Sequence, residues 1–111
     1  MKKTLLFLAL LLFLSSAFSA PKVNDIIAMY DRGDKFVQAY VRGYATAMLW
    51  MDIENDSEGK GKKFCMPTQL VIDDQVLINA VKSYLKENPD HNDFSFEAIS
   101  IQSFKKTFPC E

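Results

Sequence analysis

The sequence predicts an all-α protein, a small bundle of four to five helices with one intramolecular disulfide. Apolar residues recur at steps of three and four over most of the 111 residues, which is the period of an amphipathic helix. Short polar breaks separate these segments, and no strand pattern of comparable length competes with them. The two cysteines, Cys65 and Cys110, enclose most of the second half of the chain. This pattern favours helices that pack on one another and are tied together at the end.

The first residues have the pattern of a secretory signal peptide. Met1-Lys2-Lys3 is basic, the run from Leu5 to Leu14 is apolar, and small residues follow up to Ala20. A transmembrane anchor is the alternative, but spanning a bilayer takes about 20 apolar residues, roughly twice the length of this run. We therefore expect residues 1–19 to be a cleaved signal. Residues 20–111 are then one periplasmic domain, without a membrane segment after cleavage.

The predicted mature domain is mildly acidic. The whole chain carries a net charge of −1 with His91 neutral, and the loss of Lys2 and Lys3 changes this to −1 − 2 = −3. Nucleic acids and anionic membranes attract basic proteins, so we expect neither as a partner. A basic protein partner is compatible with this charge.

The predicted export decides how the two cysteines are interpreted. An even number of cysteines in an oxidising compartment most simply forms internal disulfides. Joining Cys65 to Cys110 would restrict the unfolded chain by about 4 kcal/mol. An intermolecular bridge and a nucleophilic thiol are the alternatives, and the internal bond is favoured over both.

The mature chain opens with a short predicted helix. Residues 23–30 are apolar enough for two helical turns, with Asn24 or Asp25 as the N-cap. Gly33 is placed to end this helix, and Asp34 is placed to cap the next one.

The longest periodic segment predicts a helix from Asp34 to about Ile53. Trp50 falls between the two flanks of its apolar stripe, so it either covers the core or faces a partner. The expected core face comprises Phe36, Val37, Tyr40, Val41, Tyr44, Met48 and Met51.

We expect the segment from Asp52 to Lys63 to be an exposed, mobile loop. Acidic residues open it, two glycines follow and a lysine cluster closes it, so it can bury little apolar surface. A solvated connector is the simpler interpretation. In a small domain without a catalytic cleft, such a loop is also a leading candidate for contact with a partner protein. The candidate partner-binding residues are Trp50, Asp52, Glu54, Asn55, Asp56, Ser57, Glu58 and Lys60.

Two further helices are predicted after the first cysteine. Asp73 or Asp74 can cap a helix that runs to about Asn88, where Pro89 stops it. Ser95 can cap the last helix. The expected apolar residues are Val76, Leu77, Ala80, Val81, Tyr84 and Leu85 in the first helix, and Ile99, Ile101, Phe104 and Phe108 in the second.

The sequence contains few residues suited to catalysis or to holding a cofactor. One histidine and two cysteines that we expect to be oxidised do not make a typical zinc site. A Cys65–His91 nucleophile pair would need a free thiol in an oxidising space. No glycine-rich phosphate loop follows a strand, and no GxSxG motif occurs. The composition therefore favours a secreted helical binding module that is not an enzyme and has no cofactor or metal.

Several short motifs in a fixed order resemble the Rap/Tai family, the immunity proteins of type VI secretion systems. The motifs are Gly43-Tyr44, Phe64-Cys65-Met66-Pro67, Gln75, Tyr84-Leu85 with Asn88-Pro89, and Phe108-Pro109-Cys110. The resemblance covers about Gly43 to Cys110. The paired cysteines of the family fall on Cys65 and Cys110, and Gln75, Tyr84 and Leu85 fall on framework positions. The short first helix and the segment from Asp52 to Lys63 depart from the pattern.

The resemblance implies a small periplasmic helical protein, often a homodimer, that binds an injected peptidoglycan amidase and blocks its active-site cleft. Under this hypothesis the Asp52–Lys63 segment, with Trp50 at its base, contributes to the contact with the amidase. A periplasmic acid-stress chaperone of the HdeA type is the alternative. Such a protein is also small, helical and held by one disulfide, and it would expose apolar surface when its carboxylates are protonated.

Overall fold

The computed structural model describes residues 2–17, 20–67 and 72–110. Within these ranges the prediction of an all-α fold is confirmed, and so is the predicted disulfide: Cys65 and Cys110 are bonded, with their Cα atoms 5.0 Å apart. The helices are α1 (Lys2–Ala17), α2 (Val23–Asp31), α3 (Lys35–Ser57), α4 (Asp74–Glu87), the short 3-10 helix η1 (Pro89–His91) and α5 (Phe96–Thr107).

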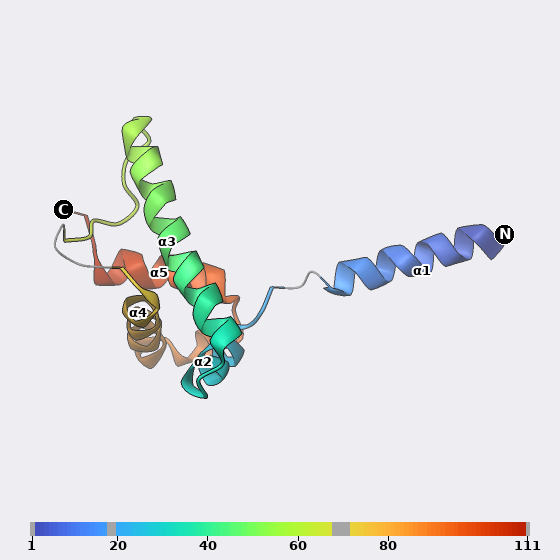
Figure 1. Cartoon of the computed structure of the whole chain (residues 1–111). Helices are drawn as coiled ribbons and strands as arrows, with labels where there is room; N and C mark the ends of the chain where they lie inside the picture. Colours follow the sequence, from blue (N-terminus) through green and yellow to red (C-terminus); the bar gives the residue numbers. More distant parts are fainter. Residues whose placement is uncertain (1, 18–19, 68–71, 111) are drawn as a thin grey trace.

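The longest helix, α3, dominates the architecture. It crosses the body formed by α2, α4 and α5, and its C-terminal end projects beyond them (Figure 1). Helix α4 packs against both α3 and α5, and α2 packs against the same two helices. Helix α1 extends away from this body (Figure 1). None of the helices in the described ranges is long and apolar enough to cross a membrane.

The core lies where α3, α4 and α5 meet. The ring of Phe104 packs edge-on against the ring of Phe64, with the ring centroids 5.3 Å apart, so the segment that follows α3 takes part in the core. Each large apolar side chain buried in this way contributes about 1.5–3 kcal/mol. The largest fully buried side chains are Phe96, Phe104, Leu77, Ile78 and Ile99.

Helix α2 begins without the side-chain cap that the sequence predicted. Its N-cap residue is Lys22, so the assignment of Asn24 or Asp25 as the cap is wrong. The first amides are satisfied by a distant segment instead, because the Val23 N–H donates to the Phe94 carbonyl over 2.9 Å. In return the Phe96 N–H donates to the Pro21 carbonyl over 3.0 Å. A backbone pairing therefore replaces the cap and joins the start of α2 to the start of α5.

The predicted caps of the other helices are confirmed. Gly33 has a φ of +81° and follows the end of α2, a conformation that glycine adopts without strain. The Asp34 carboxylate accepts the Val37 N–H at 3.0 Å at the start of α3. Asp73 and Ser95 accept equivalent bonds at the starts of α4 and α5.

The buried stripe of α3 is narrower than the sequence predicted. Phe36 is 85% exposed and Met51 is 67% exposed, so their assignment to the core is wrong. Both lie outside the stripe of α3 that is buried. The residues of α3 that are buried are Val37, Val41, Ala45, Met48 and Asp52.

Candidate functional site

The first part of the predicted loop is helical. Helix α3 continues to Ser57, about one turn beyond the predicted end near Ile53, so the prediction of a loop is wrong for residues 52–57. The helix ends at a glycine cap: Gly59 has a φ of +78°, and its N–H donates to the Asp56 carbonyl at 3.1 Å. The Lys60 N–H donates to the Asn55 carbonyl at 2.8 Å, which completes a Schellman motif. We call residues 54–60 the tip.

Asp52 has a structural role at the base of the tip. Its residue surface is only 5% exposed, although the sequence placed it among the partner-binding residues. Its carboxylate accepts the backbone N–H of Lys63 at 2.5 Å, which holds the returning chain against α3. A buried carboxylate with a backbone donor is a satisfied polar group. Asp52 is therefore enclosed and unsuited to direct contact with a partner.

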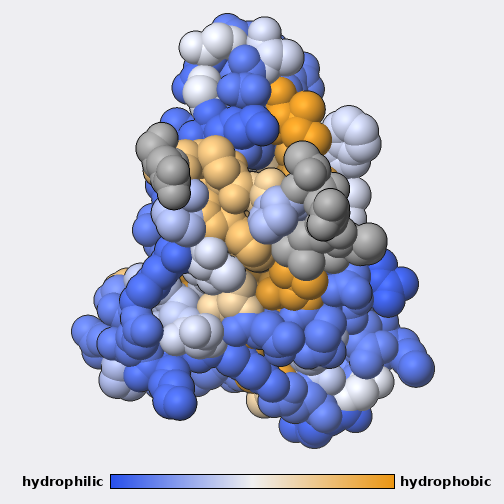
Figure 2. All heavy atoms as spheres, turned by 90° about the vertical axis from the view of Figure 1, so that its left-hand side faces the viewer, coloured by the Kyte–Doolittle hydropathy of each residue, from blue (hydrophilic) through white to orange (hydrophobic). Residues whose placement is uncertain are grey.

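The other candidate residues are gathered on one projecting surface. Trp50 is 63% exposed and lies just before the tip, so it does not cover the core. Asn55 is half-buried, because it faces a hollow beside α3. The space-filling view shows a hydrophilic upper end above exposed hydrophobic surface (Figure 2). The tip residues with exposed side chains are Glu54, Asp56, Ser57, Glu58 and Lys60.

Local bonds give the tip a defined shape. The Ser57 hydroxyl donates to the Glu54 carbonyl at 2.8 Å. The Lys60 ammonium lies 2.7 Å from the Glu58 carboxylate, although both side chains are about half exposed and such pairs contribute little to stability. The Glu58 N–H also donates to the Glu54 carbonyl at 3.0 Å. The tip is thus a capped helix end that carries an excess of acidic groups.

The chain returning from the tip is fixed to α5. Phe64 is buried against Phe104, and the Cys65 N–H donates to the Phe108 carbonyl at 2.8 Å. The disulfide to Cys110 closes the same junction. These contacts hold the returning chain in place at the base of the tip. The tip itself projects beyond the other helices.

An apolar hollow of ≈ 200 Å³ opens beside the C-terminal half of α3. It is smaller than most small-molecule sites, which occupy about 300–1,000 Å³. Ile101, which the sequence predicted to supply an apolar contact of the last helix, is 38% exposed at the edge of this hollow. This hollow was not predicted from the sequence, although the wide apolar stripe of α3 could have indicated it. Its lining includes Tyr44, Ala47, Met48, Met51, Phe64 and Ile101.

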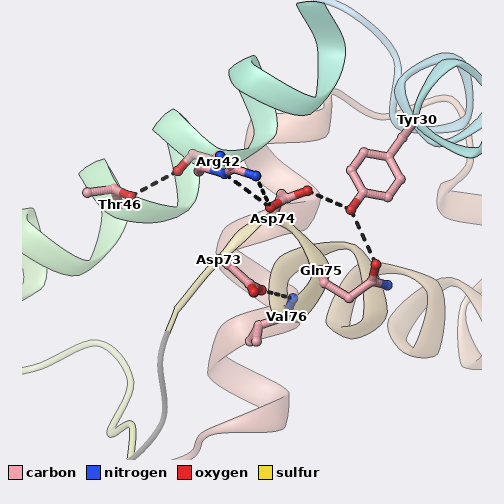
Figure 3. A network of polar contacts seen from close by, with 7 residues as sticks. All are labelled: Tyr30, Arg42, Thr46, Asp73, Asp74, Gln75 and Val76. Atoms are coloured by element: carbon pink, nitrogen blue, oxygen red, sulfur yellow. Dashed lines mark hydrogen bonds and ion pairs between the residues drawn. The ribbon is translucent and has the colours of Figure 1, made fainter. Parts of the chain in front are cut away.

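A polar network fixes α3 on α4 and α2 at the opposite end from the tip (Figure 3). The Asp74 carboxylate accepts the Tyr30 hydroxyl at 2.8 Å and the Arg42 Nε–H at 3.2 Å. Burial of Asp74 is the largest influence and opposes ionisation. This influence of burial is outweighed by the hydrogen bonds that Asp74 accepts from Tyr30, from its own backbone and from Arg42, together with the Arg42 charge. The pKa of Asp74 is therefore lowered. Burial, followed by the bond to Asp74, raises the pKa of Tyr30 to about 12.

The arrangement is suited to binding. Among the residues that the structure describes, no three His, Cys, Asp or Glu side chains gather as they would around a metal ion. The accessible features of this surface are a capped acidic helix end, an exposed tryptophan and an apolar hollow large enough for one side chain. Fold and surface together define a small disulfide-linked helical protein with a preformed, projecting tip.

The family comparison agrees with this class of protein. The sequence model of the Rap1a immunity proteins matches residues 22–110, and the chain belongs to this family. The resemblance to immunity proteins deduced from the sequence motifs is thereby confirmed. No curated protein and no solved structure gave a significant match to the chain.

Proposed function

We propose that the protein is a periplasmic immunity protein that inhibits a type VI secreted peptidoglycan amidase by occluding its active site. Membership of the immunity family supports a role in neutralising an effector. The observation that carries the proposed contact is the tip, a capped helix end that projects beyond the bundle and is anchored at its base by Asp52 and the disulfide.

The proposed inhibition needs no chemistry from the inhibitor. An active-site cleft is concave, and a projecting helix end is a complementary shape. Because the tip is already ordered by its cap, little conformational entropy is lost when it binds. Residues 54–60 are fewer than the roughly 20–30 residues that each partner contributes to a standard interface, so the surface around Trp50 would complete the contact.

The charge of the tip defines the partner surface that it fits. Glu54, Asp56 and Glu58 outnumber the single lysine of the tip. We expect basic residues around the amidase cleft, since complementary charge speeds association and selects among partners.

A wall-digestion assay tests the function. Candidate peptidoglycan amidases are titrated with the wild-type protein, and the expected result is stoichiometric loss of the activity of one of them. If no amidase binds or loses activity, the proposed function is wrong.

A charge reversal tests the contact surface. Glu54→Lys should weaken inhibition of the sensitive amidase by tenfold or more, because it reverses an exposed charge on the tip. Asp25→Lys is the matched control: it reverses an exposed acidic residue on α2, in the body of the protein. Full inhibition by a folded Glu54→Lys variant would show that the contact lies elsewhere.

Export through a cleaved signal of residues 1–19 is part of the same proposal. Helix α1 stands off from the body (Figure 1), and its described side chains from Leu5 to Leu8 are exposed to solvent. We expect the protein in the periplasmic fraction to begin at Ala20, and the intact mass will test this. The homodimer implied by the resemblance also belongs to this proposal, and each copy would carry one tip.

A further inference from the structure

A second hollow, of ≈ 470 Å³, lies between η1 and the first half of α5, and no residue of the tip lines it. Its volume falls within the range of about 300–1,000 Å³ that is usual for binding sites. Ile101 lines this hollow and also the smaller one beside α3, so it lies between the two. We call this second space the aromatic hollow. Its lining includes Tyr84, His91, Phe94, Ala98, Ile101 and Gln102.

Three rings form one wall of the aromatic hollow. The His91 ring stacks on the ring of Phe94, with the ring centroids 4.8 Å apart and the planes 26° apart. On its other side, His91 Nδ1 lies 2.9 Å from the hydroxyl oxygen of Tyr84. These contacts join the end of α4 to the turn before α5, so the rings make a continuous aromatic surface.

The backbone of the turn fixes this wall in advance. The His91 N–H donates to the Asn88 carbonyl at 3.0 Å, and the Phe94 N–H donates to the His91 carbonyl at 3.1 Å. The Phe94 carbonyl in turn accepts the Val23 N–H at the start of α2. The Asn88 side-chain amide donates to the Tyr84 carbonyl at 3.0 Å, which ties the turn to α4. Because the wall keeps its shape without a ligand, binding there costs little conformational entropy.

The wall is only partly covered by the protein itself. Phe94 is 52% exposed, and Ile101 on the facing helix is 38% exposed. The amide of Gln102 lines the same space and is the only side-chain amide among the lining residues. The aromatic hollow therefore offers a ring face, an apolar side chain and a hydrogen-bonding group to a ligand.

Two weakly engaged carboxylates lie on the same turn. Asp90 Oδ2 is 4.0 Å from His91 Nε2, too far for a hydrogen bond, and the Asp90 side chain is 85% exposed. Asp93 directly precedes Phe94, and its side chain is 79% exposed. Its ion pair with Lys22 is long, at 3.9 Å, and such exposed pairs are weak. Acidic groups beside an exposed aromatic wall favour a ligand that is both cationic and able to stack on a ring.

We propose that the aromatic hollow binds an arginine side chain of a partner protein. The guanidinium stacks on Phe94 and pairs with the carboxylates of Asp90 and Asp93, and the oxygen of Gln102 is a further acceptor. The apolar stem of the arginine covers Ile101. Arginine fits better than lysine, because the guanidinium is planar, stacks on aromatic rings and is more weakly hydrated than an ammonium group.

This site is separate from the tip, and its test does not require the effector. Residues 54–60 are at the C-terminal end of α3, whereas the aromatic hollow lies beside the first half of α5. A partner that engages both surfaces gains from both contacts. The identity of the partner of the tip does not enter the argument for the aromatic hollow.

The first test is a titration with a blocked tripeptide that has one arginine between two leucines. The full chain is expressed with export and its native disulfide, labelled, and followed by NMR up to millimolar peptide, because a single side chain binds weakly. We expect the signals of His91, Phe94 and Gln102 to shift. The same peptide with citrulline, which has the shape of arginine without its charge, should bind about tenfold more weakly or worse. No shift at these residues, or equal binding of the citrulline peptide, would overturn the proposal.

Variants test the two parts of the site separately. Asp90→Asn combined with Asp93→Asn should weaken binding of the arginine peptide by about tenfold, and both positions are exposed, so the fold should be kept. Asp56→Asn combined with Glu58→Gln is the matched control, since it removes the same charge from the tip. Phe94→Ala should remove the stacking surface and leave the backbone bond to Val23 in place. Unchanged binding by both folded site variants would show that the peptide binds elsewhere.

Free arginine distinguishes a partner protein from a small molecule as the source of the guanidinium. Its own carboxylate is repelled by Asp90 and Asp93, so we expect it to bind more weakly than the blocked peptide. Free arginine that binds the aromatic hollow more tightly than the peptide would identify a small-molecule site and would overturn the assignment to a partner protein.

Discussion

Asp74 provides the sharpest test of how α3 is held on the bundle. Its carboxylate lies between Tyr30 of α2 and Arg42 of α3, and the side chain is only 13% exposed. The substitution Asp74→Asn keeps the shape and removes the charge that both partners address. We expect it to lower the free energy of unfolding at pH 7.

The size of the effect follows from the two partners. Arg42 is 67% exposed, so solvent screens its ion pair, which is worth about 0–1 kcal/mol. The Tyr30 hydroxyl donates to a charged acceptor at 2.8 Å, and a bond of this kind is worth about 1.5–3 kcal/mol, part of which an amide oxygen retains. The expected loss is about 1–2 kcal/mol. For a domain of this size that corresponds to a fall in Tm of about 4–16 °C.

The effect should depend on pH in a defined direction. Because the pKa of Asp74 is lowered in the folded state, its charge stabilises the protein at pH values above the ordinary carboxylate pKa. This stabilisation is lost as pH falls through the ordinary value and then the lowered folded value. The difference between wild type and Asp74→Asn should therefore shrink on acidification below about pH 4.

Urea unfolding at neutral and acidic pH measures both quantities, with urea chosen because it does not screen charge. Asp31→Asn is the matched control, since Asp31 forms an exposed pair with Lys82 and its loss should cost at most about 1 kcal/mol. An Asp74→Asn variant as stable as wild type at pH 7, or an equal loss at every pH, would refute the reasoning.

Two further predictions concern the base of the tip. Replacing Asp52 by Ala leaves the Lys63 N–H without its acceptor. We expect the free energy of unfolding, measured in urea, to fall by about 1–3 kcal/mol, and amide exchange at Lys63 to become faster. Unchanged exchange at Lys63 would contradict this. Replacing Cys65 and Cys110 by Ala opens a loop with a sequence separation of 45, so we expect a loss of about 4 kcal/mol, checked by thermal unfolding of the variant beside the reduced wild type. A variant that unfolds at the wild-type temperature would show that the bond adds nothing to equilibrium stability.

The features predicted correctly from the sequence are those with local causes. Asp34, Asp73 and Ser95 cap their helices because a side-chain oxygen reaches an amide three residues ahead. Gly33 ends α2 because it adopts a positive φ. These outcomes depend on neighbouring residues only, so sequence is enough to predict them.

The features predicted wrongly have distant causes. The start of α2 is satisfied by the carbonyl of Phe94, which is far away in the sequence. The periodicity of α3 identified a wide apolar stripe, but the part that is covered depends on where α4 and α5 lie. Phe36 and Met51 were therefore assigned to the core, although they are exposed.

The conformation of the segment proposed to contact the partner was predicted wrongly, since residues 52–57 belong to α3. Charge and glycine content distinguished residues 52–63 from the rest of the chain. The glycines were interpreted as loop residues, although Gly59 forms the cap at the end of α3. Asp52 was counted as exposed because charged residues usually are. Its burial depends on the Lys63 N–H, a partner that only the folded chain places beside it.

The length of α3 explains why a tip exists and why it needs support. Helix α3 has 23 residues and α4 has 14, so at 1.5 Å per residue α3 is longer by about 13 Å. Isolated helical turns are marginal in water, so the surplus needs contacts of its own. Asp52 binds the returning backbone, Phe64 enters the core, and the Cys65–Cys110 bond closes the base. A buried carboxylate, an aromatic ring and a disulfide thus support a surface that contributes little to the core. Such support is expected of a binding surface, which must keep its shape before the partner arrives.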